Sequence, residues 1–186
     1  MLVILPLLLA ATSAGTCPAE PPPLPIAQSV SESALAVELA SCELAPEKAA
    51  RVFALAGRQG NVEAGADGIS VVFLHGYPEE VSLQRDGHPE GLTLRFSPIG
   101  LPTSSECWQS GVKRELASWS KGRKARAEQW DASGRRSQNV YDDVWAYGYS
   151  EAVEHYAPGG HISWTEAWSK YTGDRLVWTG SLFDRR

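Results

Sequence analysis

The chain has 186 residues, a formal net charge of −5 at pH 7 and an isoelectric point near 5.4. This length suits one domain or one and a half. An acidic chain lacks the basic footprint of a nucleic-acid-binding protein, so we expect no nucleic acid partner.

The N-terminus predicts export. An apolar run from Leu2 to Ala11 is followed by the small residues Thr12, Ser13 and Ala14, where signal peptidase could cut. The run is shorter than the about 20 apolar residues that a permanent membrane span needs. We therefore predict a signal peptide over residues 1–14 and a bacterial protein that is periplasmic, outer-membrane-attached or secreted.

A proline-rich stretch follows the apolar run. Residues 15–32 are predicted to form an extended tether, because prolines between Pro18 and Pro25 stiffen the backbone. Cys17, at the start of this tether, is a candidate for lipid attachment. Such a lipid would be the only membrane contact that we expect.

In an oxidising compartment, Cys17, Cys42 and Cys107 can form one disulfide and leave one thiol over. We favour Cys42–Cys107 because Cys17 lies in the proline-rich stretch, although the other pairings and three free thiols stay open. No cysteine lies at metal-site spacing from a histidine, so we expect no metal and no cofactor.

Residues 33–80 are predicted to form a mixed N-terminal segment. Helical pattern is confined to Ser33–Gln59, with Pro46 at a first helical position and Gly57 as a stop. The continuous apolar run Ile69–His75 is typical of a buried strand.

Residues 81–186 repeat one pattern, in which an aromatic residue precedes a glycine by a few positions. The glycines from Gly100 to Gly173 recur every 11–14 residues, which suits one strand and one tight turn per step. We therefore predict an all-β fold, an antiparallel β-meander of repeated hairpins. The aromatic ladder consists of Phe96, Trp108, Trp119, Trp130, Tyr147, Tyr156, Trp168 and Trp178.

The segment Ile162–Ser169 alternates large apolar residues with small or polar ones, as a half-buried strand does. One face of the sheet should therefore be aromatic, and we expect each tryptophan to be a core residue. Tryptophans exposed in a row would instead favour a glycan- or cell-wall-binding module.

The repeated hairpins resemble the MORN-variant repeat family over about residues 87–184. The resemblance rests on three segments that pair an aromatic residue with an X-Gly turn: 107–115, 129–136 and 155–161. Ser-Gly, Lys-Gly and Gly-Gly replace the family's Asn-Gly turns. Since the family includes bacterial proteins labelled as antitoxins, the resemblance implies a binding or scaffolding role with an unknown protein partner.

Charge is uneven along the repeats. The segment 111–136 has eight basic residues against three acidic ones, whereas 142–166 has five acidic residues and no Lys or Arg. Because neighbouring strands would bring these blocks together, we expect them to pair with each other across strands.

One local motif favours an enzyme. Residues 71–78 resemble an α/β-hydrolase oxyanion loop, and Ser150 lies in a near match to the Gly-x-Ser-x-Gly elbow, with His155 and His161 downstream. The chain has no β-α alternation and no helical pattern after Ser150, so an esterase is the least favoured reading. We predict no catalytic residues and a non-enzymatic protein that presents a sheet surface to a protein partner.

Overall fold

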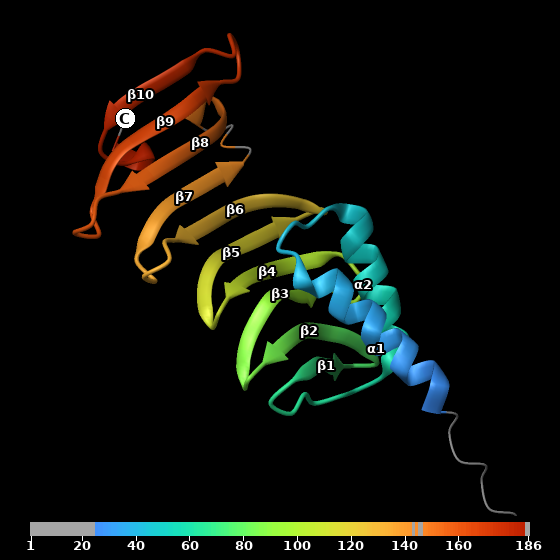
Figure 1. Cartoon of the computed structure of the whole chain (residues 1–186). Coiled ribbons are helices and arrows are strands. Elements are labelled where there is room, and N and C mark those ends of the chain that lie inside the picture. The colour runs from blue at the N-terminus through green and yellow to red at the C-terminus, as the bar shows by residue number, and fades with distance from the viewer. Residues whose placement is uncertain (1–24, 143, 145–146, 185–186) are drawn as a thin grey trace, which may run out of the picture.

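The protein folds around a single ten-stranded antiparallel sheet in which each strand pairs with the next along the chain (Figure 1). The structure, a computed structural model, describes residues 25–142, 144 and 147–184. The predicted signal peptide and Cys17 lie outside this range. The prediction of an all-β meander is confirmed. The strands are β1 (Gly68–Leu74), β2 (Tyr77–Arg85), β3 (His88–Phe96), β4 (Pro102–Gln109), β5 (Val112–Ser120), β6 (Arg123–Trp130), β7 (Arg136–Asp142), β8 (Tyr149–Tyr156), β9 (Ile162–Ser169) and β10 (Arg175–Thr179).

Glycines set the turns as expected. Ser110 and Gly111, between β4 and β5, have φ values of 51° and 72°, and Lys121 and Gly122 repeat this between β5 and β6. Two consecutive positive φ angles are typical of the two-residue turns whose twist matches that of the flanking strands. The boundary that we predicted at residue 80 falls inside β2, so the N-terminal strands belong to the same sheet as the repeats.

Two helices precede the sheet, α1 (Pro25–Ala40) and α2 (Pro46–Gln59). The end of the predicted tether, 25–32, is therefore helical. Pro46 begins α2 as predicted, because its fixed φ suits a first turn. The predicted stop at Gly57 is wrong: the helix continues to Gln59, and Gly60 takes the positive φ, 77°, that ends it.

The helices lie on one face of β1, β2 and β3, where they bury the main core (Figure 1). Leu35 and Leu39 of α1 and Val52 of α2 are fully buried against the sheet. β1 is half-exposed, since Val72 and Leu74 point away from this core, so the prediction of a buried strand holds only for alternate residues. No helix among the described residues is long and apolar enough to cross a membrane.

One row of directly paired residues crosses all ten strands and identifies the face on which the helices lie, which we call the helix face. Its members are Val71, Val81, Leu94, Ser105, Ala117, Ala127, Val140, Val153, Glu166 and Val177. Because directly paired residues share a face, the row can be followed beyond the helices. From β5 to β10 no described element covers it (Figure 1).

The opposite face, called the back face, carries a second and smaller core near the C-terminus. Tyr141, Ala152 and Ala167 of three neighbouring strands pack there against Leu182. Leu182 belongs to a short 3-10 helix, Leu182–Asp184, that folds back after β10. The two cores therefore lie on opposite faces and at opposite ends of the sheet.

Candidate functional site

The aromatic ladder does not form one aromatic face, contrary to the prediction. Trp119 lies on the helix face, where its indole nitrogen donates to the hydroxyl of Ser105 at 2.8 Å. Trp108 and Trp130 lie on the back face. The reason is a β-bulge beside each of these tryptophans, at Cys107/Trp108, Ser118/Trp119 and Gln129/Trp130, which adds a residue and shifts the alternation.

None of the described tryptophans is fully buried as a core residue would be: each is half-buried, and Trp178 packs at the edge of the smaller core. Another side chain lies over most of these rings. The pairs are Lys113 over Trp108 at 4.8 Å, Lys124 over Trp119 at 5.9 Å, Arg136 over Trp130 at 5.8 Å, His155 on Trp164 at 3.6 Å and Tyr149 on Trp178 at 5.9 Å. A sugar binds to a tryptophan by stacking on an exposed face of its ring. Because another side chain already covers one face of these rings, they are less suited to form a row of sugar-binding surfaces.

A glutamate holds the cation in the first three of these pairs. Lys113 forms an ion pair with Glu106 at 3.0 Å, and Lys124 forms one with Glu115 at 2.6 Å. Arg136 pairs with Glu128 in the same way. The spacing Glu-x-Trp at 106–108 and 128–130 is a sequence signal for two of these three arrangements, whereas Glu115 and Trp119 do not follow it.

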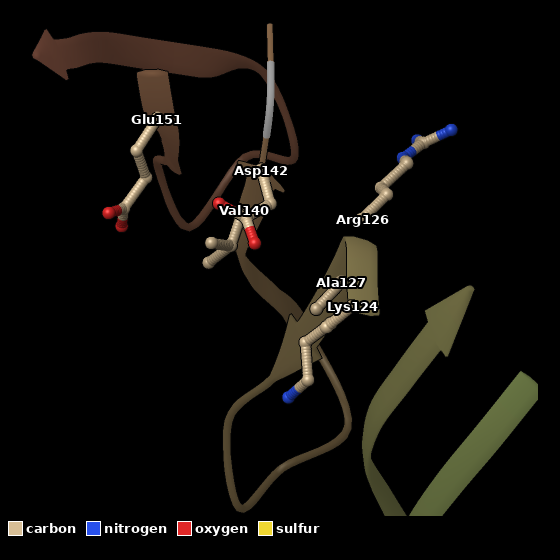
Figure 2. Close-up of a pocket in the computed structure, with 6 residues that line it drawn as sticks. All are labelled: Lys124, Arg126, Ala127, Val140, Asp142 and Glu151. Atoms are coloured by element: carbon tan, nitrogen blue, oxygen red, sulfur yellow. The ribbon is translucent and has the colours of Figure 1, made fainter. Parts of the chain in front are cut away.

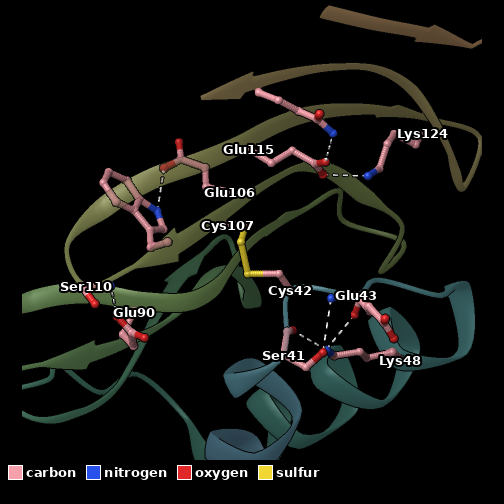
Figure 3. Close-up of a disulfide and its surroundings, with 12 residues drawn as sticks. Ser41, Cys42, Glu43, Lys48, Glu90, Glu106, Cys107, Ser110, Glu115 and Lys124 are labelled. Atoms are coloured by element: carbon pink, nitrogen blue, oxygen red, sulfur yellow. Dashed lines mark hydrogen bonds and ion pairs between the residues drawn. A yellow bond between two sulfur atoms is a disulfide. The ribbon is translucent and has the colours of Figure 1, made fainter. Parts of the chain in front are cut away.

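The predicted Cys42–Cys107 disulfide is present and joins the loop between α1 and α2 to β4 (Figure 3). Its Cα atoms are 5.4 Å apart. The ammonium of Lys48 supports the same loop, donating to the carbonyl oxygens of Ser41 at 2.6 Å and Glu43 at 2.7 Å. Burial lowers the pKa of Lys48. The disulfide is consistent with an exported protein.

Next to the helices, the uncovered helix face forms a groove across the strands. Ala127 and Val140 of the central row make its floor, and the longer side chains that flank the central row on the same face make its walls. One wall consists of Glu115, Gln129, Gln138 and His155, and the other of Trp119, Lys124, Asp142, Glu151 and Trp168.

The groove is closed at one end and open at the other. At β5 and β6, Lys124 reaches across to Glu115, which explains why Ala117 and Ala127 are buried without any covering element. At β7 the groove opens into a hollow of about 180 Å³, whose lining side chains Figure 2 shows. Its lining combines the apolar Ala127 and Val140 with Lys124, Arg126, Asp142 and Glu151.

The basic and acidic blocks do not pair with each other, contrary to the prediction. Lys113, Lys124 and Arg136 each pair instead with a glutamate of the preceding strand. Asp142 and Glu151, which face each other across β7 and β8, have no ion-pair partner among the described residues.

A polar cluster lies at the His155 end of the groove. Nε2 of His155 lies 3.0 Å from Oε1 of Glu166, and Nδ1 lies 3.1 Å from Nε2 of Gln138. Burial by itself would raise the pKa of Glu166, but the bonds from His155 and Arg175 outweigh it and hold the pKa below its usual value. Both ring nitrogens of His155 are in hydrogen-bonding contact with other side chains, and its ring stacks on Trp164. We therefore assign His155 a structural role.

The hydrolase motif is not assembled. Ser150 lies within strand β8, not on a strand-to-helix turn, and its hydroxyl donates to the carbonyl oxygen of Trp168 at 3.3 Å. His155 bonds to other side chains, as described above. Within the residues that the structure describes, no three His, Cys, Asp or Glu side chains converge into a metal-binding group.

Sequence reasoning missed a buried carboxylate on the back face. Glu154 is 1% exposed and accepts hydrogen bonds from four donors. These are Ser181 Oγ at 2.6 Å, the Leu182 amide at 2.9 Å, Tyr141 OH at 2.8 Å and Asn139 Nδ2 at 3.4 Å. Two of the donors belong to the C-terminal segment, so Glu154 fixes that segment to the sheet.

Burial and hydrogen bonding in this cluster shift the pKa values of Glu154 and Tyr141 in opposite directions. Burial alone would raise the pKa of Glu154, but its four hydrogen bonds outweigh burial and lower the pKa below its usual value. Burial and the bond to ionised Glu154 raise the pKa of Tyr141 to about 12. At neutral pH the carboxylate of Glu154 is therefore charged and the phenol of Tyr141 is neutral. In this state Glu154 accepts the hydrogen bonds that hold the C-terminal segment at Ser181 and Leu182.

Comparison with known proteins does not identify a family. No family model matches the chain, and no curated protein matches it. Among solved structures, the crystal structure of a GtfA/B complex bound to UDP and GlcNAc shares 9% identity at a TM-score of 0.39, over 60% of this chain and 24% of that one. The crystal structure of accessory secretory protein 1,2 and 3 in Streptococcus pneumoniae shares 13% identity at a TM-score of 0.21, over 51% and 20%.

Both likenesses are too weak to carry an argument, and the chain spans at most about a quarter of either protein.

Proposed function

We propose that this chain is a non-enzymatic, exported β-repeat protein that binds another protein through the uncovered part of its helix face. One observation carries the proposal. The helices cover only the first strands of this face, and beyond them a groove with Ala127 and Val140 in its floor and charged side chains around it lies uncovered. Recessed surfaces that combine a few apolar side chains with convergent charged groups commonly mark binding sites.

The other readings have less support. The stacked tryptophans weigh against a glycan platform, and the strand position of Ser150 weighs against an esterase. The disulfide supports export to the periplasm, the outer membrane or the medium. The resemblance to MORN-variant repeats also favours a binding or scaffolding role.

Site-specific photo-crosslinking in the native host tests this proposal. A photoreactive phenylalanine analogue at Val140 should give discrete protein adducts on irradiation, because this position forms the groove floor. The same analogue at Val37, a 77% exposed residue of α1, is the matched control and should give none. Equal yields at the two positions, or no protein adduct at Val140, would contradict the proposal.

A further inference from the structure

The sheet has two edge strands, β1 and β10, and the described segments cover only the edge at β1. There the chain between α2 and β1 runs alongside the strand, and Val62 and Val71 exchange backbone hydrogen bonds of 2.9 and 2.7 Å. The Phe73 amide donates to Oδ1 of Asn61 at 3.1 Å. β10 is the last strand of the sheet, and no described segment pairs with its outer edge. An uncovered edge strand is a template for another strand.

The backbone groups that face outward from β10 can be assigned from its hairpin with β9. The amide of Ser169 donates to the carbonyl oxygen of Asp174 at 2.9 Å, so the backbone groups of Asp174 point toward β9. Because these groups alternate along an antiparallel strand, those of Arg175, Val177 and Thr179 point away from β9. The outer edge of β10 therefore presents the N–H and C=O groups of three alternate residues.

The side chains of β10 favour pairing with another strand. Val177 is 57% exposed on the helix face, and Leu176 is 37% exposed on the back face. Arg175 is the one ionisable residue of the strand, and its guanidinium pairs with Glu166 of β9. β10 therefore lacks the uncompensated charge that commonly prevents contact between sheet edges.

A second copy of the chain supplies a matching edge. If two β10 strands pair in antiparallel fashion about Val177, each Val177 faces the other, and Arg175 faces Thr179 of the second copy. Every one of these facing pairs then joins backbone groups that point outward, and each such pair exchanges two hydrogen bonds. On the back face, Leu176 would face Trp178 of the second copy, which places two apolar side chains together. Each copy contributes the same surface, as a two-fold interface requires.

The other described elements leave room for this arrangement. The helices pack on β1, β2 and β3, at the opposite end of the sheet (Figure 1). The 3-10 helix after β10 folds back onto the back face of its own sheet, where Leu182 packs against residues of β7, β8 and β9. Since the described chain covers the edge at β1, the open edge that a second copy offers is again β10. We propose that two copies of this chain join edge to edge through β10 and form one continuous sheet.

Sedimentation equilibrium of the oxidised protein tests this proposal. The interface is small, so the wild type should associate weakly, with dimers present at about 300 μM. Val177→Lys places like charges opposite each other at the centre of the interface and should weaken association by about tenfold or more. Val177→Pro should weaken it as much, because it removes the outward amide without removing a bond to β9. Val72→Lys is the matched control, since Val72 is a 41% exposed valine on the covered edge strand, and it should leave association unchanged.

A cysteine at the centre of the interface tests the register. The Cα atoms of a hydrogen-bonded antiparallel pair lie about 5.5 Å apart, which is within the range of about 4.4–6.8 Å that a disulfide spans. In a Cys17→Ser background, Val177→Cys should therefore give a covalent dimer on oxidation. Thr179→Cys, which would face Arg175, should give none.

Far-ultraviolet circular dichroism checks that each variant folds. A monomeric wild type at about 300 μM would overturn the inference. So would a dimer that neither substitution of Val177 weakens, a Val72→Lys variant weakened as much as Val177→Lys, or equal covalent dimer from the two cysteine variants. Val140 lies on β7, away from the β10 edge, so crosslinking from Val140 tests the groove independently of this result.

Discussion

Gly91 offers the most direct test of how the helices are seated on the sheet. It has a φ of +65°, and a Cβ added there would lie 2.2 Å from the carbonyl oxygen of Leu39 at the end of α1. An alanine at position 91 must therefore push α1 away from β3. Leu35 and Leu39, which are fully buried at this contact, would lose part of their packing.

The expected cost has two parts. An alanine held in the left-handed region costs about 1–2 kcal/mol, and overpacking of a close-packed contact costs a further 1–3 kcal/mol. We expect Gly91→Ala to lower the free energy of unfolding by about 3–4 kcal/mol. Gly87→Ala is the matched control, because Gly87 has a φ of +74° and its Cβ would meet nothing within 4 Å.

Urea denaturation of the oxidised protein, followed by tryptophan fluorescence, measures both variants. Gly87→Ala should lose only the strain part, about 1–2 kcal/mol. If the two variants lose the same free energy of unfolding, the close approach of α1 to β3 at Gly91 does not contribute to stability. That result would refute the reasoning about how α1 packs on the sheet.

Two other predictions concern the Cys42–Cys107 disulfide and the buried carboxylate of Glu154. Cys42 and Cys107 are 65 residues apart, so the chain-entropy relation gives about 4 kcal/mol of stability that a Cys42→Ser/Cys107→Ser variant should lose in urea denaturation; an unchanged midpoint would contradict this. The folded pKa of Glu154 lies below its usual 4.5, so its stabilisation is complete above that pH and is lost as pH falls through the folded value. Glu154→Gln should cost about 2 kcal/mol at pH 7 and flatten the acid limb of a stability–pH curve, whereas an unaltered acid limb would exclude this role.

The sequence by itself determined the topology. Glycine is needed wherever a hairpin turn has a positive φ, so the regular spacing of Gly100, Gly111 and Gly122 could be read directly as antiparallel strands in chain order. The helix start at Pro46 follows from a similar local rule. The Cys42–Cys107 pair was favoured because the third cysteine lies in a proline-rich stretch, and that simple argument held.

Only the tertiary structure decided which face each side chain occupies. A β-bulge shifts the alternation by one residue, so Trp119 and Trp130 lie on opposite faces although their sequence contexts are alike. The seat of α1 on Gly91 and the tie between Glu154 and the C-terminal segment each join residues far apart in the chain. Local patterns carry no information on such contacts, because they depend on how ten twisted strands place distant residues together.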